Sequence, residues 1–187
     1  FLFCLIGIML VINPIFSAKL IRNATAGPKG SLRIGLAGEI DPLDPNNTVN
    51  RSTQRVVQQI FETLITADYS MNFQPLLATS WEITPDGKAL IFNLRRGVKF
   101  HDGTSFDSSS VKLTFDRMKN QKLKRWSLFS GFLESVEVIN EYTVKMNLKG
   151  SPNTALTVLS IAGQIECPIA VEKYGKAAVH AVEAWNN

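Results

Sequence analysis

The sequence predicts an α/β protein in which flanking helices cover a mixed sheet, and three observations support this fold class. Residues 89–94 form a short apolar run, and apolar and polar residues alternate within 134–148, as is typical of strands. Residues 108–119 instead carry apolar side chains at helical spacing. The chain of 187 residues is 45% hydrophobic and 19% charged, which is ordinary for a globular protein with a sizeable core.

Residues 80–103 are predicted to form a meander of three short strands. Pro85 fixes φ at the second position of the first turn, and Gly87 supplies a permissive position in the same turn. Residues 98–100 are the third expected strand, and His101–Gly103 form the turn that closes it.

The helix over 108–119 is predicted to begin at Asp107 or Ser108, since both can cap a helix N-terminus. Its apolar set is Val111, Leu113, Phe115 and Met118. We expect Phe92 and Leu94 of the preceding strand to be buried together with Val111 and Phe115.

On the N-terminal side, the sequence predicts a first strand at 32–36 and a loop rich in Pro, Asp and Asn at 39–48. A helix capped by Ser52 follows, with an apolar stripe formed by Val56, Val57, Ile60, Phe61 and Leu64. Composition alone favours a solvated connection for the loop.

On the C-terminal side, residues 134–148 are predicted to form a hairpin that turns at Asn140–Glu141. A short helix capped by Ser151 or Asn153 then ends at Leu159. A brief strand at 164–167 follows, and a last helix is expected from Pro168 through Tyr174, ending at Gly175.

The first 16 residues are almost entirely apolar, and three interpretations compete for them: a core helix, a membrane span and a signal-peptide hydrophobic region. Asn13–Pro14 interrupts the run, which is also short for a span. Because Ala24-Thr25-Ala26 offers a small-x-small cleavage site, we expect residues 1–26 to be a signal peptide whose start is clipped. Residues 27–187 would then be secreted to the periplasm.

Charge and cysteine content argue against a nucleic-acid-binding protein and against an internal disulfide. Lys19 and Arg22 lie in the expected leader, so the remainder carries 18 basic and 16 acidic residues, a net charge of +2. This balance is too weak for a nucleic-acid footprint. Cys4 is also in the leader, which leaves Cys167 without an internal disulfide partner.

The sequence offers no arrangement typical of catalysis or of metal and cofactor binding. His101 beside Asp102 is interpreted as a turn residue, and Cys167 as a small buried hydrophobe that lies 13 residues from His180. No phosphate loop, nucleophile elbow or metalloprotease motif is present. We therefore expect a binding protein without enzymatic activity, metal site or cofactor.

Four segments carry a resemblance to a known family: LATSW at 77–81, TPDG at 84–87, LRRGVKFHDG at 94–103 and the helix motif at 106–117. They resemble the signature of the family 5 extracellular solute-binding proteins of bacterial ABC importers. The helix departs from the family pattern at Ser108 and Ser110, where Ala or Thr and Asp are more usual. The resemblance extends loosely from Leu32 to about Gly175.

This resemblance implies a fold like that of type II periplasmic binding proteins. Residues 27–187 would form lobe I only, truncated before lobe II. It also implies a monomer that captures a small peptide or a related solute, such as a nickel chelate, by closing two lobes, and delivers it to an ABC permease in the inner membrane. Two alternatives stay open: a secreted non-catalytic interaction module, and a non-functional truncated product.

The family positions also indicate which residues of this chain would contact the solute. They are the loop residues Glu39, Ile40, Asp41 and Leu43, together with the pair Arg125 and Trp126. The pair resembles a cationic-aromatic pair of the nickel-chelate binders, although Trp126 is equally well explained as a core anchor. The basic segment 120–125 that leads to this pair is expected to be solvated.

Overall fold

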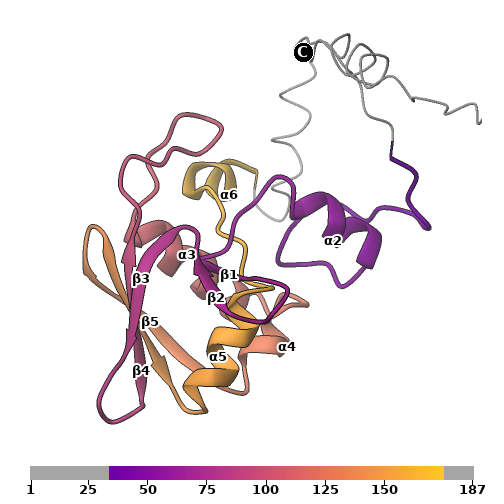
Figure 1. Cartoon of the computed structure of the whole chain (residues 1–187). Coiled ribbons are helices and arrows are strands. Elements are labelled where there is room, and N and C mark those ends of the chain that lie inside the picture. The colour runs from indigo at the N-terminus through magenta and orange to yellow at the C-terminus, as the bar shows by residue number, and fades with distance from the viewer. Residues whose placement is uncertain (1–33, 175–187) are drawn as a thin grey trace, which may run out of the picture. The chain divides into compact units, whose positions relative to one another are not determined.

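The computed structural model describes residues 34–174 (Figure 1). The chain divides into two compact units, residues 1–35 and 36–187, and all of the secondary structure described below lies in the second unit. The expected signal peptide at 1–26 and the expected helix end at Gly175 lie outside the described residues.

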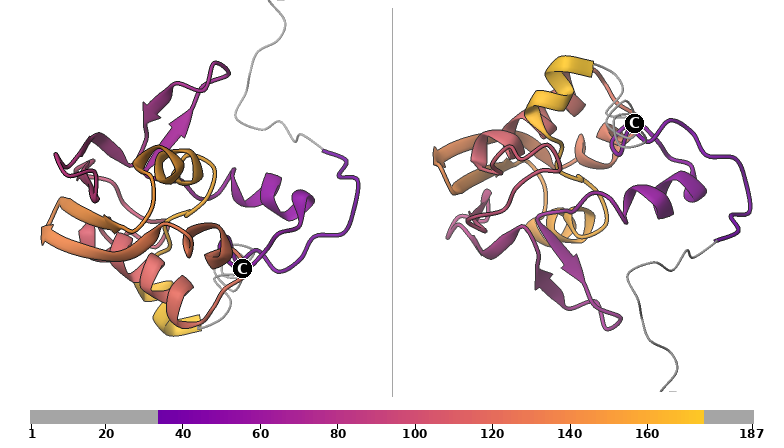
Figure 2. Two further views of the ribbon diagram at one scale, coloured as in Figure 1. Left: turned by 90° about the horizontal axis from the view of Figure 1, so that it is seen from below. Right: turned by 90° about the horizontal axis from the view of Figure 1, so that it is seen from above.

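A four-stranded antiparallel sheet forms the centre of this unit, with the strand order β3-β4-β6-β5 (Figures 1 and 2). The strands are β3 (Ala78–Ile83), β4 (Ala89–Leu94), β5 (Leu133–Asn140) and β6 (Thr143–Leu148). The predicted strand at 89–94 and the predicted hairpin at 134–148 are thus confirmed.

The turn between β3 and β4 follows directly from its residues. The amide of Gly87 donates to the Thr84 carbonyl at 2.8 Å, and Gly87 has φ +67°, a value that favours glycine. The Thr84 hydroxyl donates to Oδ1 of Asp86, which also accepts from the Lys88 amide. The turn predicted around Pro85 and Gly87 is confirmed.

The third strand of the predicted meander is not present. Residues 98–100 make one isolated bridge, between Lys99 and Ser105, and the Phe106 amide donates to the Val98 carbonyl. The free edge of β4 is instead occupied by β6, which pairs with it from Ala89–Asn147 to Asn93–Thr143. A distant segment with five paired positions forms a longer ladder than the three residues nearby could provide.

A second, two-stranded sheet precedes the central one. It consists of β1 (Ile65–Ala67) and β2 (Phe73–Pro75). The carboxylate of Asp68 holds the connecting turn by accepting hydrogen bonds from the amides of Ser70 and Asn72.

The helices are α2 (Arg51–Val57), α3 (Ser108–Asn120), α4 (Trp126–Phe129), α5 (Pro152–Leu159) and α6 (Pro168–Tyr174). The prediction for α3 is confirmed, because Oδ1 of Asp107 accepts from the Ser110 amide at 3.0 Å and begins the helix. Helix α3 lies along β5 and β6 (Figure 2).

The core lies between α3 and the inner face of the central sheet. As expected, Phe92, Leu94, Val111 and Phe115 are all buried in it. Phe115 and Phe129 meet edge to face, with their ring centroids 5.3 Å apart.

Gly163 lies against these two rings and has φ +80°. A Cβ atom at this position would lie 3.0 Å from Phe115 and 3.1 Å from Phe129. Both the backbone conformation and the close approach of the rings therefore require glycine here.

Three sequence predictions are wrong in detail. Residues 34–36 of the expected first strand are not in a strand, and neither are residues 164–167. Helix α2 ends at Val57 and is capped by Asn50, whose Oδ1 accepts from the Ser52 and Thr53 amides, so the cap precedes the expected Ser52. An Asn side chain two residues earlier satisfies the same free amides.

Candidate functional site

The loop before α2 is anchored by its own polar side chains. The Asp41 amide donates to the Thr53 hydroxyl at 2.8 Å, and the Thr48 hydroxyl donates to Oδ2 of Asp41 at 3.0 Å. Deeper in the structure, Asp44 and Asn46 are buried. The loop over residues 41–50, called the anchored loop below, is thus an ordered wall and not a solvated connection.

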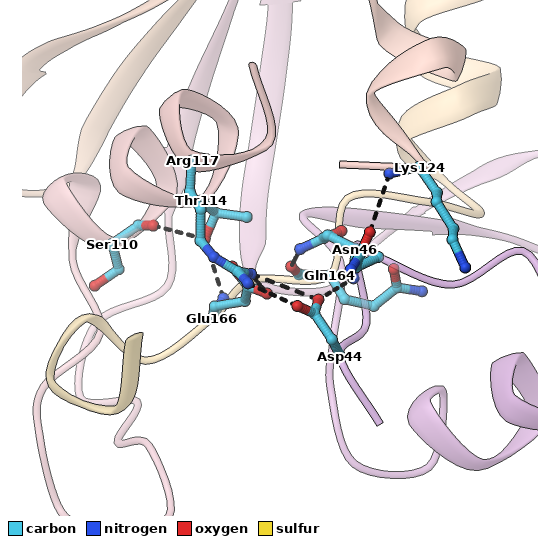
Figure 3. A network of polar contacts seen from close by, with 9 residues as sticks. Asp44, Asn46, Ser110, Thr114, Arg117, Lys124, Gln164 and Glu166 are labelled. Carbon is cyan, nitrogen blue, oxygen red and sulfur yellow. Dashed lines mark hydrogen bonds and ion pairs between the residues drawn. The ribbon is translucent and has the colours of Figure 1, made fainter. Parts of the chain in front are cut away.

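Arg117 of α3 reaches between the anchored loop and the segment before α6 (Figure 3). Its Nη2 lies 2.6 Å from Oδ2 of Asp44, and its Nη1 lies 2.5 Å from Oε1 of Glu166. All three side chains are at least nine-tenths buried. One guanidinium therefore joins three segments that are far apart in sequence.

Burial and charge shift the pKa values of this trio. Desolvation is the main cause that raises the pKa of Glu166 to about 7, and the charge of Asp44 adds to it, while Arg117 opposes it. Desolvation lowers the pKa of Arg117, but the bonds and charges of its two carboxylate partners outweigh this and raise it. Two buried carboxylates share one cation, so the balance of charge favours the neutral form of one acid.

Arg125 lies beside the same loop in very different surroundings. Its guanidinium donates to Oε1 of Gln54, to Oε1 of Gln164 at 3.5 Å and to the Ile161 carbonyl at 3.3 Å. Within residues 34–174, no carboxylate lies at ion-pairing distance from it. Desolvation accordingly lowers the pKa of Arg125.

The structure connects the segment that holds Arg125 to the anchored loop, which includes Asp41 and Leu43. The amide of Arg125 donates to the Asn46 carbonyl at 3.2 Å, and the amide of Lys124 donates to Oδ1 of Asn47 at 3.4 Å. The segment at 124–125 is therefore tied to the anchored loop by two hydrogen bonds.

The six predicted contacts differ in how they are placed. Glu39 and Ile40 are exposed, whereas Asp41, Leu43 and Trp126 are half-buried and Arg125 is buried. The carboxylate of Asp41 is already engaged by Thr48. The Trp126 ring packs against the core, as the core-anchor interpretation predicts, and also retains an accessible part.

Two expectations about burial, one for a segment and one for a single residue, are wrong. The basic segment 120–125 is not solvated throughout, because Leu123 and Arg125 are buried while Lys122 and Lys124 are exposed. Cys167 is half-buried and not fully buried, and its thiol donates to Oδ2 of Asp102 at 3.1 Å.

Sequence reasoning missed the four buried polar residues Asp44, Asn46, Arg117 and Glu166. One signal was available: Glu166 is a single acid between Ile165 and Cys167, within an apolar run. A buried acid of this kind needs a partner. Its partner Arg117, 49 positions away, could not be inferred from spacing.

Two kinds of feature are absent from the part of the chain that the structure describes. Between residues 34 and 174, no three His, Cys, Asp or Glu side chains are grouped so that they could hold a metal ion. In the same range, no helix has both the length and the apolar character needed to cross a membrane.

Comparison with known proteins identifies the class as solute-binding proteins. The family model described as "Bacterial extracellular solute-binding proteins, family 5 Middle" matches residues 72–181. The glutathione-binding protein GsiB of Salmonella paratyphi A is 33% identical over 158 residues, which covers 79% of this chain and 30% of GsiB. The chain therefore belongs to family 5 of these proteins, and it spans about 30% of the length of the curated relatives that it matches.

Solved structures show the same relationship. NikA from Brucella suis, in complex with Fe(III)-EDTA, is 31% identical with a TM-score of 0.61, over 70% of this chain and 26% of NikA. AgaA from A. tumefaciens R10, in complex with agropinic acid, is 30% identical with a TM-score of 0.66, over 74% of this chain and 28% of AgaA. The mixed α/β fold with antiparallel sheets is that of family 5 binding proteins.

Proposed function

We propose that this chain provides lobe I, within residues 27–187, of a periplasmic receptor that captures a small solute and delivers it to an ABC permease. The receptor would act as a monomer, by closure of two lobes and without covalent chemistry. Family membership supports this role, because the family consists of solute-binding proteins. Residues 1–26 would act as the cleaved signal peptide.

The observation that carries the proposal is the buried Arg125 with neutral partners. A buried cation is costly unless it is paired, and Arg125 has only amide and carbonyl oxygens around it in the described residues. A carboxylate of the solute would supply the missing charge through bidentate hydrogen bonds. Small peptides and aminocarboxylate metal chelates both present such a group.

The remaining contacts would come from both sides of Arg125. Trp126 would offer an apolar surface, and the exposed Glu39 and Ile40 would lie along the same wall as Asp41 and Leu43. The relatives' printed ligands, glutathione for GsiB and agropinic acid for AgaA, support a solute that carries carboxylates.

Calorimetry tests this proposal on the full chain fused to the part of GsiB that follows the matched segment. The probes are glutathione, a tripeptide and a nickel–histidine chelate. We expect Arg125→Gln to weaken binding of the preferred probe about tenfold or more, since a charged hydrogen bond is worth about 1.5–3 kcal/mol.

Lys124→Gln is the matched control, because Lys124 is the exposed cation next to Arg125. It should change the affinity less than about twofold, as expected for a solvated charge. Equal effects of the two substitutions would overturn the role of Arg125. The unfused chain should bind about a hundredfold more weakly, because four lost polar contacts of about 1 kcal/mol each reduce affinity at least that much.

A further inference from the structure

The Asp44–Arg117–Glu166 trio holds more acid than base. Arg117 makes one short bond to each carboxylate, so a fully ionised trio would keep one negative charge out of water. Such a charge is costly in the interior of a protein. One retained proton would make the trio neutral.

The partners of the two carboxylates indicate where this proton lies. Both oxygens of Asp44 accept hydrogen bonds, Oδ2 from Arg117 at 2.6 Å and Oδ1 from the backbone amide of Asn46 at 3.1 Å. In contrast, Oε2 of Glu166 is buried without a hydrogen-bond partner among the described residues, as are Nε of Arg117 and Oδ1 of Asn46. Glu166 is therefore the acid that is less well held in its ionised form.

Desolvation and the charge of Asp44 raise the pKa of Glu166, and they outweigh the charge of Arg117 and the hydrogen bond from the Asn46 side chain, which both lower it. A proton on Oε2 of Glu166 removes the excess charge and leaves Oε1 free to accept from Arg117.

We propose that Glu166 is a positioning residue that carries a proton at neutral pH, and that the neutral trio so formed fastens the anchored loop to α3. Loss of the proton sets two ionised carboxylates around one guanidinium. The anchored loop is then held less firmly at Asp44.

The charged groups that face Glu166 are few within the described chain. Arg117 approaches from α3 and Asp44 from the anchored loop. The backbone amide of Glu166 donates to the Thr114 hydroxyl, and the thiol of the next residue, Cys167, is directed to Asp102. The raised pKa of Glu166 agrees with this environment.

The consequence for binding rests on the proposed function. Asp41 and Leu43 lie in the anchored loop, so deprotonation of Glu166 would weaken a wall of the proposed solute site. The proton itself is tested without any solute, so its test fails or succeeds independently of the proposed function.

The test compares the full chain with its Glu166→Gln variant (E166Q), whose neutral amide can still accept from Arg117. Glu137→Gln (E137Q) on β5 is the control, because Glu137 is an exposed acid. Urea unfolding is measured from pH 5 to 9. Relative to E166Q, wild type should lose stability as the pH rises toward 7, with a slope that approaches one proton.

At pH 8, E166Q should be at least as stable as wild type, and E137Q should follow the wild-type profile. A folding equilibrium constant more than about tenfold lower for E166Q at pH 8 would show that Glu166 acts as an ionised partner, and would overturn the proposal.

A second measurement uses the wild-type chain alone. Carbon-13 NMR of wild type labelled at the Glu carboxyl carbons should show one glutamate that titrates near neutral pH. Above that pH, the amide hydrogens of residues 43–47 should exchange faster than the intrinsic base-catalysed increase in exchange rate predicts. If every glutamate is ionised at pH 6, the proposal is wrong.

Discussion

Arg117 and Arg125 are buried to the same extent, with 6% and 7% of their surface exposed, and yet their surroundings are opposite. Arg117 lies between two carboxylates, whereas Arg125 has only neutral oxygen partners in the described residues. The comparison separates two uses of a buried cation. Two carboxylates surround the single positive charge of Arg117, which joins segments of the fold. Arg125 lacks a counter-charge, and a ligand could supply one.

The largest expected effect comes from removing the cation of the trio. Arg117→Leu should lower the free energy of unfolding by about 3–5 kcal/mol at pH 7, because it leaves buried carboxylates without a partner. Urea unfolding followed by circular dichroism measures this loss.

Lys112→Met is the matched control on the same helix. Lys112 pairs with Asp116 at 2.7 Å, but both side chains are more than 40% exposed. We expect a change below about 0.5 kcal/mol. If both substitutions cost the same, Arg117 does not hold the fold together as inferred.

The next largest effect is the pH dependence of stability. With a pKa of about 4.5 when unfolded and about 7 when folded, Glu166 binds more protons in the native state between these values. Its contribution is therefore complete below pH 4.5 and is lost as the pH rises to 7, by about 3 kcal/mol. The measured quantity is the difference in unfolding free energy between wild type and E166Q at pH 5 and pH 8.

Other acids act in the opposite direction, so the difference between the two proteins is essential. Hydrogen bonds from Asn72 lower the pKa of Asp68, and the Thr84 hydroxyl lowers that of Asp86. Their stabilising contributions are lost as the pH falls. Because wild type and E166Q share these groups, a difference that grows with acid in favour of E166Q would contradict the assignment.

Among the three buried charged groups compared, the smallest expected effect on stability belongs to Arg125. Arg125→Met should change the free energy of unfolding by less than about 1 kcal/mol, because removing a desolvated cation without an ionic partner offsets the lost hydrogen bonds. Thermal unfolding without solute measures this change. A loss as large as that of Arg117→Leu would show that Arg125, too, serves the fold.

Local residues account for the parts of the fold that the sequence predicted well. The bounds of β4 and the start of α3 depend on Gly87 and Asp107, whose backbone conformation and side-chain bond act within a few residues. The hairpin of β5 and β6 is equally local. These elements need no knowledge of the distant chain.

The solute contacts, the loop residues and Arg125 among them, were indicated only by their family positions and stay a prediction. The hydrogen bond from the Arg125 amide to the Asn46 carbonyl connects Arg125 to the anchored loop. No pattern in the sequence indicated that Arg125 would be buried without a carboxylate while Arg117 would receive two.

The sequence by itself determined the alternating strands, the turns, the helix cap and the family signature, because each depends on residues that are neighbours along the chain. The tertiary structure decided which strand pairs with β4 and which acids surround Arg117. Both outcomes depend on contacts between segments far apart, such as Asp44 and Arg117, which lie 73 positions apart. The proton that we propose on Glu166 is of the same kind, since it depends on burial and on the charges of two distant segments.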